Sequence, residues 1–271
     1  MKPFESFLAT QLNDYIVHRQ SHGYVIRAFR GHLLSFDRYL KDKGADWNTL
    51  QPSFFLEMRA DLQMQATSVN KVLSAARLFF NFLVRRGDVA DNPLRDIPFL
   101  KEGIVVPFNF SPEQTDHLLQ AVCKRVRREE RLILTDLARY LAVLLLARCG
   151  LRISEPLEIM RQHYRRDDAT LYIEKTKFRK DRLIPAPRAV ITEIENYLSL
   201  RDHLGHNHQN PYLLAGKGHK PLSEYDVRFF FRRAVKDIGL EHPRKLVGNM
   251  IFNPPTPHSL RHSFAVNTLI K

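Results

Sequence analysis

The sequence predicts a mainly α-helical protein with a small β-sheet, of the α+β class, divided into two domains. Its 271 residues exceed the roughly 100–200 residues that one hydrophobic core usually serves. Apolar residues recur along several segments at the three-four spacing of amphipathic helices. Two short apolar runs in the second half flank a basic stretch, as the strands of a hairpin do. These observations favour a helical first domain and a mixed second domain.

Residues 1–88 are expected to form the helical domain. Apolar residues within 68–86 follow the spacing of one buried helix face, and Gly87 is placed to end that helix. A second helix is expected over 24–40, with Val25 as the first residue of its apolar face. The opposite face of this helix carries Arg27, Arg30 and Arg38. These arginines form either a solvated surface or a surface that faces DNA, and the sequence leaves both interpretations open.

Residues 89–110 are interpreted as a linker, because three Xaa-Pro steps in this stretch disfavour helix continuation. Ser111 then resembles a helix cap, with proline in the first turn. The second domain is therefore expected to cover 111–271, and to be incomplete at its C-terminus for the reason given below.

Helices and two strands are expected in the second domain. Residues 132–149 are apolar nearly all round, which predicts a central buried helix that ends at Gly150. Residues 171–173 and 182–184 are predicted as short strands joined by a basic connection. Further helix starts are expected at Ser223 and at Thr256-Pro257.

The charge balance favours a polyanionic partner. Lysine and arginine total 42 against 29 acidic residues, which gives a net charge of +13. Residues 1–100 hold 13 basic and 10 acidic residues, and residues 101–271 therefore hold 29 and 19. A strongly basic second half suits nucleic acid better than a neutral substrate.

The composition gives little support for an oxidising compartment, a zinc site or a membrane-spanning segment. Two cysteines make neither a disulfide framework nor a zinc site, so a reducing cytoplasm is expected. The longest apolar run, 141–147, is far shorter than the ~20 residues that span a bilayer, so no membrane association is expected.

Three places in the second half could serve phosphoryl transfer, which needs positive groups, a nucleophile and an acid for the leaving oxygen. Arg152 directly follows the predicted buried helix, where its side chain can be aimed from a rigid position. The connection 175–180 is basic, and flanking strands can anchor it beside a DNA groove. His258 and Arg261 are three residues apart, so they share one helix face. Taken singly, each is more readily explained by an ordinary salt bridge, a solvated turn or chance spacing.

In order and in residues, these motifs resemble those of the tyrosine recombinases, the phage-integrase family. Residues 150–155 (GLRISE) resemble the family's first arginine motif, and residues 176–185 (TKFRKDRLIP) its β-hairpin lysine motif. Residues 258–265 (HSLRHSFA) are similar to the His-x-x-Arg box. The resemblance implies an N-terminal SAM-like core-binding domain and a mixed catalytic domain, and it covers essentially the whole chain.

The resemblance also implies roles for individual residues. Arg152 and Arg261 would bind the non-bridging oxygens of the scissile phosphate and neutralise charge that grows in the transition state. His258 would hydrogen-bond the same phosphate and assist proton transfer. Glu155 would brace the arginines. No metal and no cofactor is implied, because the arginines supply the positive charge.

In the family, the lysine of the hairpin motif acts as the general acid. Lys177 is expected to protonate the departing 5′ oxygen, with Lys175 and Lys180 as alternatives, because the register of a loop is hard to fix from sequence. Arg179, in the same connection, is expected to contact DNA.

The family places a further His or Trp and the nucleophilic tyrosine beyond the His-x-x-Arg helix. Only ten residues follow Arg261, and all nine tyrosines lie upstream of it. The chain is therefore expected to be truncated before its nucleophile, and to bind DNA without cutting it. A partner subunit could in principle donate the tyrosine.

The function expected of the complete protein is site-specific recombination through a 3′-phosphotyrosyl intermediate. It would bind double-stranded DNA as a clamp, act as a homo-oligomer with a tetramer on paired sites, and associate with the nucleoid. Three alternatives remain: a non-catalytic DNA-binding protein derived from the same fold, a metal-dependent nuclease, and a helical RNA-binding module.

Overall fold

The computed structural model describes residues 2–174, 181–204 and 209–269, and these divide into two compact units. Unit 1 comprises Met1–Gly103 and unit 2 comprises Ile104–Lys271. Both are built mainly from helices, with two small sheets in unit 2, which confirms the predicted fold class. None of the helices in the described ranges has the length and apolar character needed to cross a bilayer.

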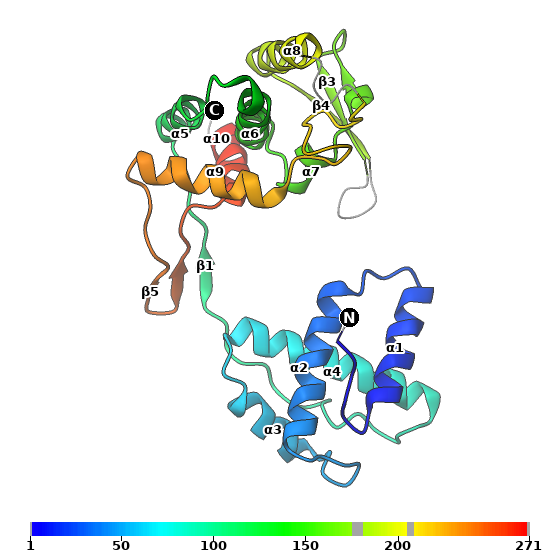
Figure 1. Cartoon of the computed structure of the whole chain (residues 1–271). Coiled ribbons are helices and arrows are strands. Elements are labelled where there is room, and N and C mark those ends of the chain that lie inside the picture. Colours follow the sequence, from blue (N-terminus) through cyan, green and yellow to red (C-terminus); the bar gives the residue numbers. More distant parts are fainter. Residues whose placement is uncertain (1, 175–180, 205–208, 270–271) are drawn as a thin grey trace. The chain divides into compact units, whose positions relative to one another are not determined.

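Unit 1 is a group of four helices around one apolar core. They are α1 (Ala9–Ser21), α2 (Arg27–Asp42), α3 (Pro52–Asp61) and α4 (Ala66–Arg86), shown in blue to cyan in Figure 1. Gly87 adopts a left-handed conformation and ends α4 as predicted. The start of α2 was placed too early, because Val25 precedes the helix and is exposed. Apolar spacing alone does not show where a helix begins, and α2 has no side-chain cap to mark its start.

The first part of the segment interpreted as a linker packs on unit 1. Leu94 and Ile97 are buried in its core, and Arg77 of α4 donates hydrogen bonds to both of their carbonyl oxygens, at 2.9 and 2.5 Å. The side chain of Asn92 donates to the carbonyl of Arg77. Prolines show that this segment is not helical, but not whether it packs against a core.

Unit 2 is organised around one buried helix. That helix is α6 (Glu130–Cys149), which ends at a left-handed Gly150 and contacts most of the unit's other helices, as predicted for a segment that is apolar all round. The others are α5 (Pro112–Lys124), α7 (Ser154–Glu158), α8 (Arg188–His203), α9 (Glu224–Asp237) and α10 (Pro257–Leu269). Ser111 caps α5 in a full capping box, and Ser223 caps α9.

The predicted strand pair belongs to an antiparallel sheet. Its strands are β2 (Tyr164–Arg165), β3 (Thr170–Ile173) and β4 (Arg182–Pro185), in that order, with Leu171 opposite Ile184. The connection that carries Lys175, Lys177, Arg179 and Lys180 lies outside the described residues. A short 3-10 helix, Arg161–His163, precedes β2.

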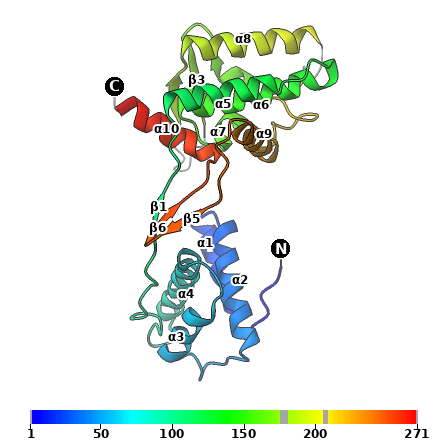
Figure 2. The ribbon, with the colours of Figure 1, turned by 90° about the vertical axis from the view of Figure 1, so that its left-hand side faces the viewer.

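A second sheet of unit 2 was not predicted. It joins β1 (Ile104–Val106), β6 (Met250–Phe252) and β5 (Lys245–Val247), with β1 parallel to β6 (Figure 2). Two of its strands come from a hairpin between α9 and α10, and β1 comes from the second part of the linker segment. Strands of three residues carry too little alternation to be recognised, and a parallel partner distant in sequence leaves no turn signal.

Position 150 can hold only a glycine without strain. Its φ is +60°, and a Cβ atom added there would lie 2.4 Å from the ring of Phe264 on α10. The turn after α6 and the close approach of α10 therefore both depend on the absence of a side chain.

We expect Gly150→Ala to destabilise unit 2 by about 2–4 kcal/mol, from left-handed strain of about 1–2 kcal/mol and overpacking against Phe264. Gly239→Ala is the matched control: its φ is +68° and an added Cβ would meet nothing within 4 Å, so only strain applies. Urea denaturation followed by circular dichroism measures both. Fluorescence of the single tryptophan, Trp47, reports unit 1 separately and should not change. Equal losses for the two variants would contradict the close packing.

Candidate phosphate-binding site

The buried carboxylate of Glu155 is the centre of the site. One oxygen, Oε2, accepts hydrogen bonds from the backbone N–H of Arg152 at 2.8 Å and from Arg182 at 2.7 Å. The other, Oε1, accepts from the guanidinium of Arg152 at 2.9 Å. Arg261 lies 4.0 Å from the same carboxylate. One acid therefore gathers the three residues Arg152, Arg182 and Arg261, called the arginine cluster below.

Four separate elements bring these groups together. Gly150 ends α6, so that Arg152 leaves the helix directly beside the first turn of α7, where Glu155 lies. Arg182 is the first residue of β4. Arg261 comes from α10, which packs against α6, and it donates a hydrogen bond to the carbonyl of Gly150 at 2.5 Å. Figure 1 shows α6 and α10 side by side.

The cluster combines a strong positive charge with access to solvent. The side chains of Arg152, Arg182 and Arg261 are 30%, 33% and 32% exposed, whereas that of Glu155 is only 5% exposed. Burial and the neighbouring Arg152 lower the pKa of Arg261, and Glu155 partly opposes this shift. Three guanidinium groups around one carboxylate leave an excess of two positive charges, which suits a bound phosphate.

His258 lies in the first turn of α10, on the face that carries Arg261. Partial burial lowers its pKa below 6.5, and the nearby His262, Arg261 and Arg152 lower it further by repelling the protonated ring. The rings of His258 and His262 are 4.6 Å apart. At neutral pH a neutral imidazole can still hydrogen-bond a phosphate oxygen, and it can take up a proton when that anion arrives.

The structure thus places Arg152, Glu155, His258 and Arg261 in one site. Arg182 was missed as a site residue, although it lies within the hairpin motif. A strand that begins with an arginine directly after a basic connection was the available signal, but its partner is 27 residues away in sequence.

The arginines singled out in unit 1 lie in different surroundings. Arg27 and Arg38 are exposed on α2. Arg30 is partly buried: it donates a hydrogen bond to the carbonyl of Lys2 at 2.5 Å and lies 4.6 Å above the ring of Phe4. Arg30 therefore holds the N-terminal segment against α2, whereas the other two have surroundings that suit either of the open interpretations.

Several tyrosines of unit 2 have other roles. The hydroxyl groups of Tyr164 and Tyr172 donate to Glu195 at 2.5 Å and to Asp181 at 2.7 Å. Tyr197 is buried, and burial raises the pKa of Tyr140 to about 12.

Across the described residues, His, Cys, Asp and Glu side chains nowhere gather in groups of three or more that could hold a metal ion.

A hollow of about 510 Å³ lies beside the arginine cluster. Arg182, Arg261 and His262 line its polar side, and Phe264 and Leu269 of α10 line its apolar side. A segment with an apolar face could therefore pack next to the phosphate-binding groups.

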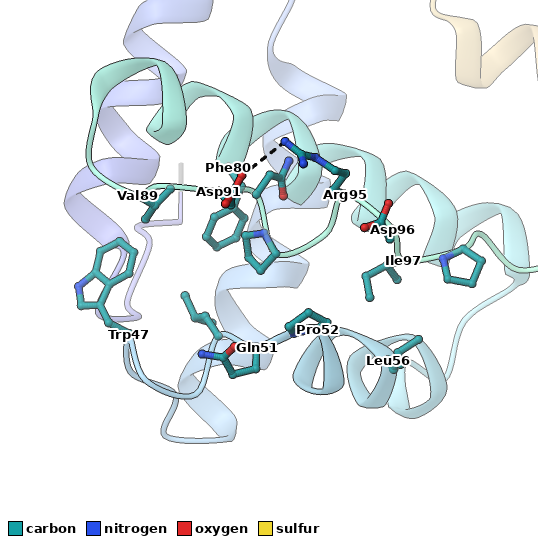
Figure 3. A pocket seen from close by; sticks show the side chains of 14 residues that line it. Trp47, Gln51, Pro52, Leu56, Phe80, Val89, Asp91, Arg95, Asp96 and Ile97 are labelled. Atoms are coloured by element: carbon teal, nitrogen blue, oxygen red, sulfur yellow. Dashed lines mark hydrogen bonds and ion pairs between the residues drawn. The ribbon is translucent and has the colours of Figure 1, made fainter.

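Another hollow, of about 610 Å³, lies in unit 1 between α3, Trp47 and residues 89–98 (Figure 3). Its floor is apolar, with Phe80 and Ile97, and its rim carries one weak ion pair of 3.5 Å between Arg95 and Asp91. It offers no group of cations comparable to the arginine cluster, so it is a poor place for phosphate.

The family of the chain follows from its sequence. Residues 109–270 match the phage integrase family, and residues 10–87 match the phage integrase N-terminal SAM-like domain. The chain belongs to the phage integrase family, which confirms the resemblance to tyrosine recombinases and the SAM-like nature of the first domain.

Individual relatives agree with this assignment. The chain is 30% identical over 226 residues to the tyrosine recombinase XerC of Alcanivorax borkumensis, covering 82% of this chain and 68% of XerC. Its fold is similar to that of a lambda integrase dimer bound to a COC′ core site, with a TM-score of 0.68, 18% identity, and coverage of 96% and 88%. A lambda integrase tetramer bound to a Holliday junction gives a TM-score of 0.67, with 18% identity and coverage of 96% and 72%.

We expect Glu155→Gln to destabilise unit 2 by about 2–4 kcal/mol, somewhat less than a fully buried ion pair because the arginines are a third exposed. The variant keeps the shape of the side chain but leaves three guanidinium groups without their counter-charge. Glu158→Gln, in the same short helix but exposed, is the control and should change stability by less than about 0.5 kcal/mol. Thermal unfolding followed by circular dichroism compares them, and equal values would contradict the central role of Glu155.

We expect His258 to titrate below 6.5 in the free chain and at higher pH when phosphate is bound, because the anion favours the protonated ring. The unfolded chain then binds this proton more readily than the folded chain, so stability falls as pH decreases through 6.5. NMR titration of the histidine ring measures the pKa. Arg152→Ala should raise it by removing one positive neighbour, and an unchanged pKa in that variant would place His258 outside the cluster.

Proposed function

We propose that the arginine cluster binds the scissile phosphate of duplex DNA, as part of a site-specific recombinase or integrase. The observation that supports this most directly is the gathering of Arg152, Arg182 and Arg261 around buried Glu155, next to His258. Cations that are solvent-accessible and held in place by a buried acid need no reorganisation when an anion arrives. The solved relatives named above are bound to DNA.

The reaction proposed for the complete recombinase is a transesterification. A tyrosine hydroxyl gives its proton to a base, for which the neutral ring of His258 is the candidate, as its oxygen bonds to phosphorus; the bond from phosphorus to the 5′ oxygen breaks, and a general acid gives that oxygen a proton. Lys177 is the proposed acid, with Lys175 and Lys180 as alternatives. The arginines neutralise the charge that grows on the non-bridging oxygens, and His258 hydrogen-bonds one of them. Glu155 acts by positioning the arginines.

We propose that these 271 residues bind DNA without forming a covalent link to it. Every tyrosine of the sequence precedes the helix that carries His258, and the hydroxyl groups of Tyr164 and Tyr172 are engaged by carboxylates. Copies of the chain would associate on paired sites; lambda integrase, which has a similar fold, is a dimer on a COC′ core site and a tetramer on a Holliday junction.

A non-catalytic DNA-binding protein is the second candidate function. It rests on the arginine cluster alone, because Arg152, Arg182 and Arg261 can hold a phosphate without taking part in any cleavage. In that case the protein would occupy recombination sites, or act only together with a partner that supplies a tyrosine.

We expect Arg152→Ala and Arg261→Ala each to weaken binding to duplex DNA about 10- to 100-fold, and to lower the salt slope of binding by about 1, because one phosphate contact is lost. Arg182→Ala should have a similar effect. Arg161→Ala is the control, since its guanidinium is 41% exposed and already paired with Asp202. Fluorescence anisotropy over a salt series measures both quantities, and an unchanged slope in all three variants would contradict phosphate binding by the cluster.

We expect the 271-residue chain to form no covalent adduct with a suicide duplex, which carries a nick beside the cleavage site so that the freed strand is lost. Denaturing gel electrophoresis shows such an adduct as a slower protein band. If an adduct forms, one of the nine tyrosines is the nucleophile, and peptide mapping would identify it.

A further inference from the structure

A column of stacked side chains lies on an exposed face of α9, away from the core of unit 2. The rings of Tyr225 and Phe229 are 6.3 Å apart with an angle of 15° between their planes. The guanidinium of Arg233 lies 5.0 Å above the ring of Phe229. These residues are four apart, so they follow one line along the helix, and we call them the α9 stack.

The α9 stack does not serve the hydrophobic core. Val227, Phe231 and Ala234 provide the buried face of α9, whereas Tyr225 is 76% exposed and Phe229 is 44% exposed. Tyr225 ends the column, and its high exposure leaves ring surface open to solvent. Exposed aromatic rings next to arginine are typical of binding surfaces rather than of ordinary solvated helix faces.

Cations surround this column. It borders a hollow of about 610 Å³, a size typical of ligand sites, between the end of α5, α6 and α9. The cations that line the hollow are Lys124, Arg125, Arg127, Arg139 and Arg233. The carboxylates paired with them are Asp136, Asp226 and Asp237. Positive charge is therefore in excess, as an anionic ligand requires.

The hollow is distinct from the arginine cluster. Arg139 lines the hollow from α6, and Gly150 at the end of the same helix lies beside the cluster. Eleven residues of α-helix separate these two positions, which corresponds to about 16 Å. One phosphate cannot contact both sites.

We propose that the α9 stack and the cations around it bind an unpaired nucleobase together with its phosphate, as presented by single-stranded DNA. A base stacked on Tyr225 would extend the column Arg233–Phe229–Tyr225, and Lys124 or Arg127 would meet the phosphate. The faces of bases in a closed duplex are covered by their neighbours, so only an unstacked base can bind in this way.

The choice of DNA as the ligand rests on the proposed function. Exchange of strands between two duplexes frees single-stranded segments near the protein, and a base platform separate from the arginine cluster could hold one of them. The same chemistry is present in a free mononucleotide, and the experiment separates the two sources.

Fluorescence anisotropy with labelled oligothymidylate of about 12 nucleotides, matched by an abasic strand of equal length, tests this proposal. We expect Tyr225→Leu to weaken oligothymidylate binding about 5- to 150-fold, while Tyr225→Phe, which keeps the ring, stays within about 2-fold of the original chain. The abasic strand should bind the original chain more weakly than oligothymidylate, and Tyr225→Leu should not change its binding. Competition by thymidine monophosphate would show that the free nucleotide suffices, and its absence that a strand is required.

Several outcomes would overturn the proposal. One is equal binding of oligothymidylate and the abasic strand, which would leave charge alone as the cause. Another is a change in self-association of Tyr225→Leu, measured by sedimentation, with single-strand binding unchanged, since the stack would then contact a second copy. A third is a loss of duplex binding by Tyr225→Leu with single-strand binding unchanged, which would show that Tyr225 contacts duplex DNA instead.

Arg152→Ala separates this proposal from the proposed function. It should weaken duplex binding, while the effect of Tyr225→Leu on oligothymidylate binding should persist in the Arg152→Ala background. If the original chain fails to bind duplex DNA while oligothymidylate binding still depends on Tyr225, the proposed function fails and the base site stands. If the chain binds duplex DNA but oligothymidylate binding does not depend on Tyr225, the proposed function stands and the base site is ruled out. Circular dichroism of each variant checks that its fold is kept.

Discussion

The carboxylate of Glu155 is the interaction on which the candidate site depends. Three guanidinium groups that converge on one place repel one another, and a mostly buried acid is what holds them there. Because the acid is buried while the arginines are a third exposed, the counter-charge cannot turn away to solvent, but the cations can still reach a ligand. The chain thus keeps a phosphate-binding arrangement assembled before any phosphate is bound.

The fold of unit 2 brings the arginines to Glu155 from several elements. Gly150 ends α6 and lets the ring of Phe264 approach, so that α10 lies close enough for Arg261 to hydrogen-bond the carbonyl of Gly150. The antiparallel sheet supplies Arg182 at the start of β4. Partial burial lowers the pKa of His258 most, and the same cations lower it further, so the protonation of that ring is coupled to whatever the cluster binds.

Much of the fold and four of the five described site residues could be predicted from local sequence. Arg152, His258 and Arg261 lie just after a helix end or on one helix turn, where a glycine and residue spacing fix the geometry over a few positions. Arg182 could not be predicted to join them, because its partner is 27 residues away and the pairing depends on how a sheet packs beside α7. The sheet of β1, β5 and β6 was not predicted for a related reason, because β1 pairs with a strand far along the chain. The packing of Leu94 and Ile97 on unit 1 likewise depends on tertiary contacts that prolines in the sequence do not reveal.

The most direct test of the central claim is a crystal structure of the chain bound to duplex DNA. It should show the guanidinium groups of Arg152 and Arg261 hydrogen-bonded to non-bridging oxygens of one and the same phosphate, at about 2.7–3.1 Å, with Glu155 still paired with Arg152 and Arg182. If the DNA instead lies elsewhere on the protein, or if the two arginines contact different phosphates, the arginine cluster is not a phosphate-binding site.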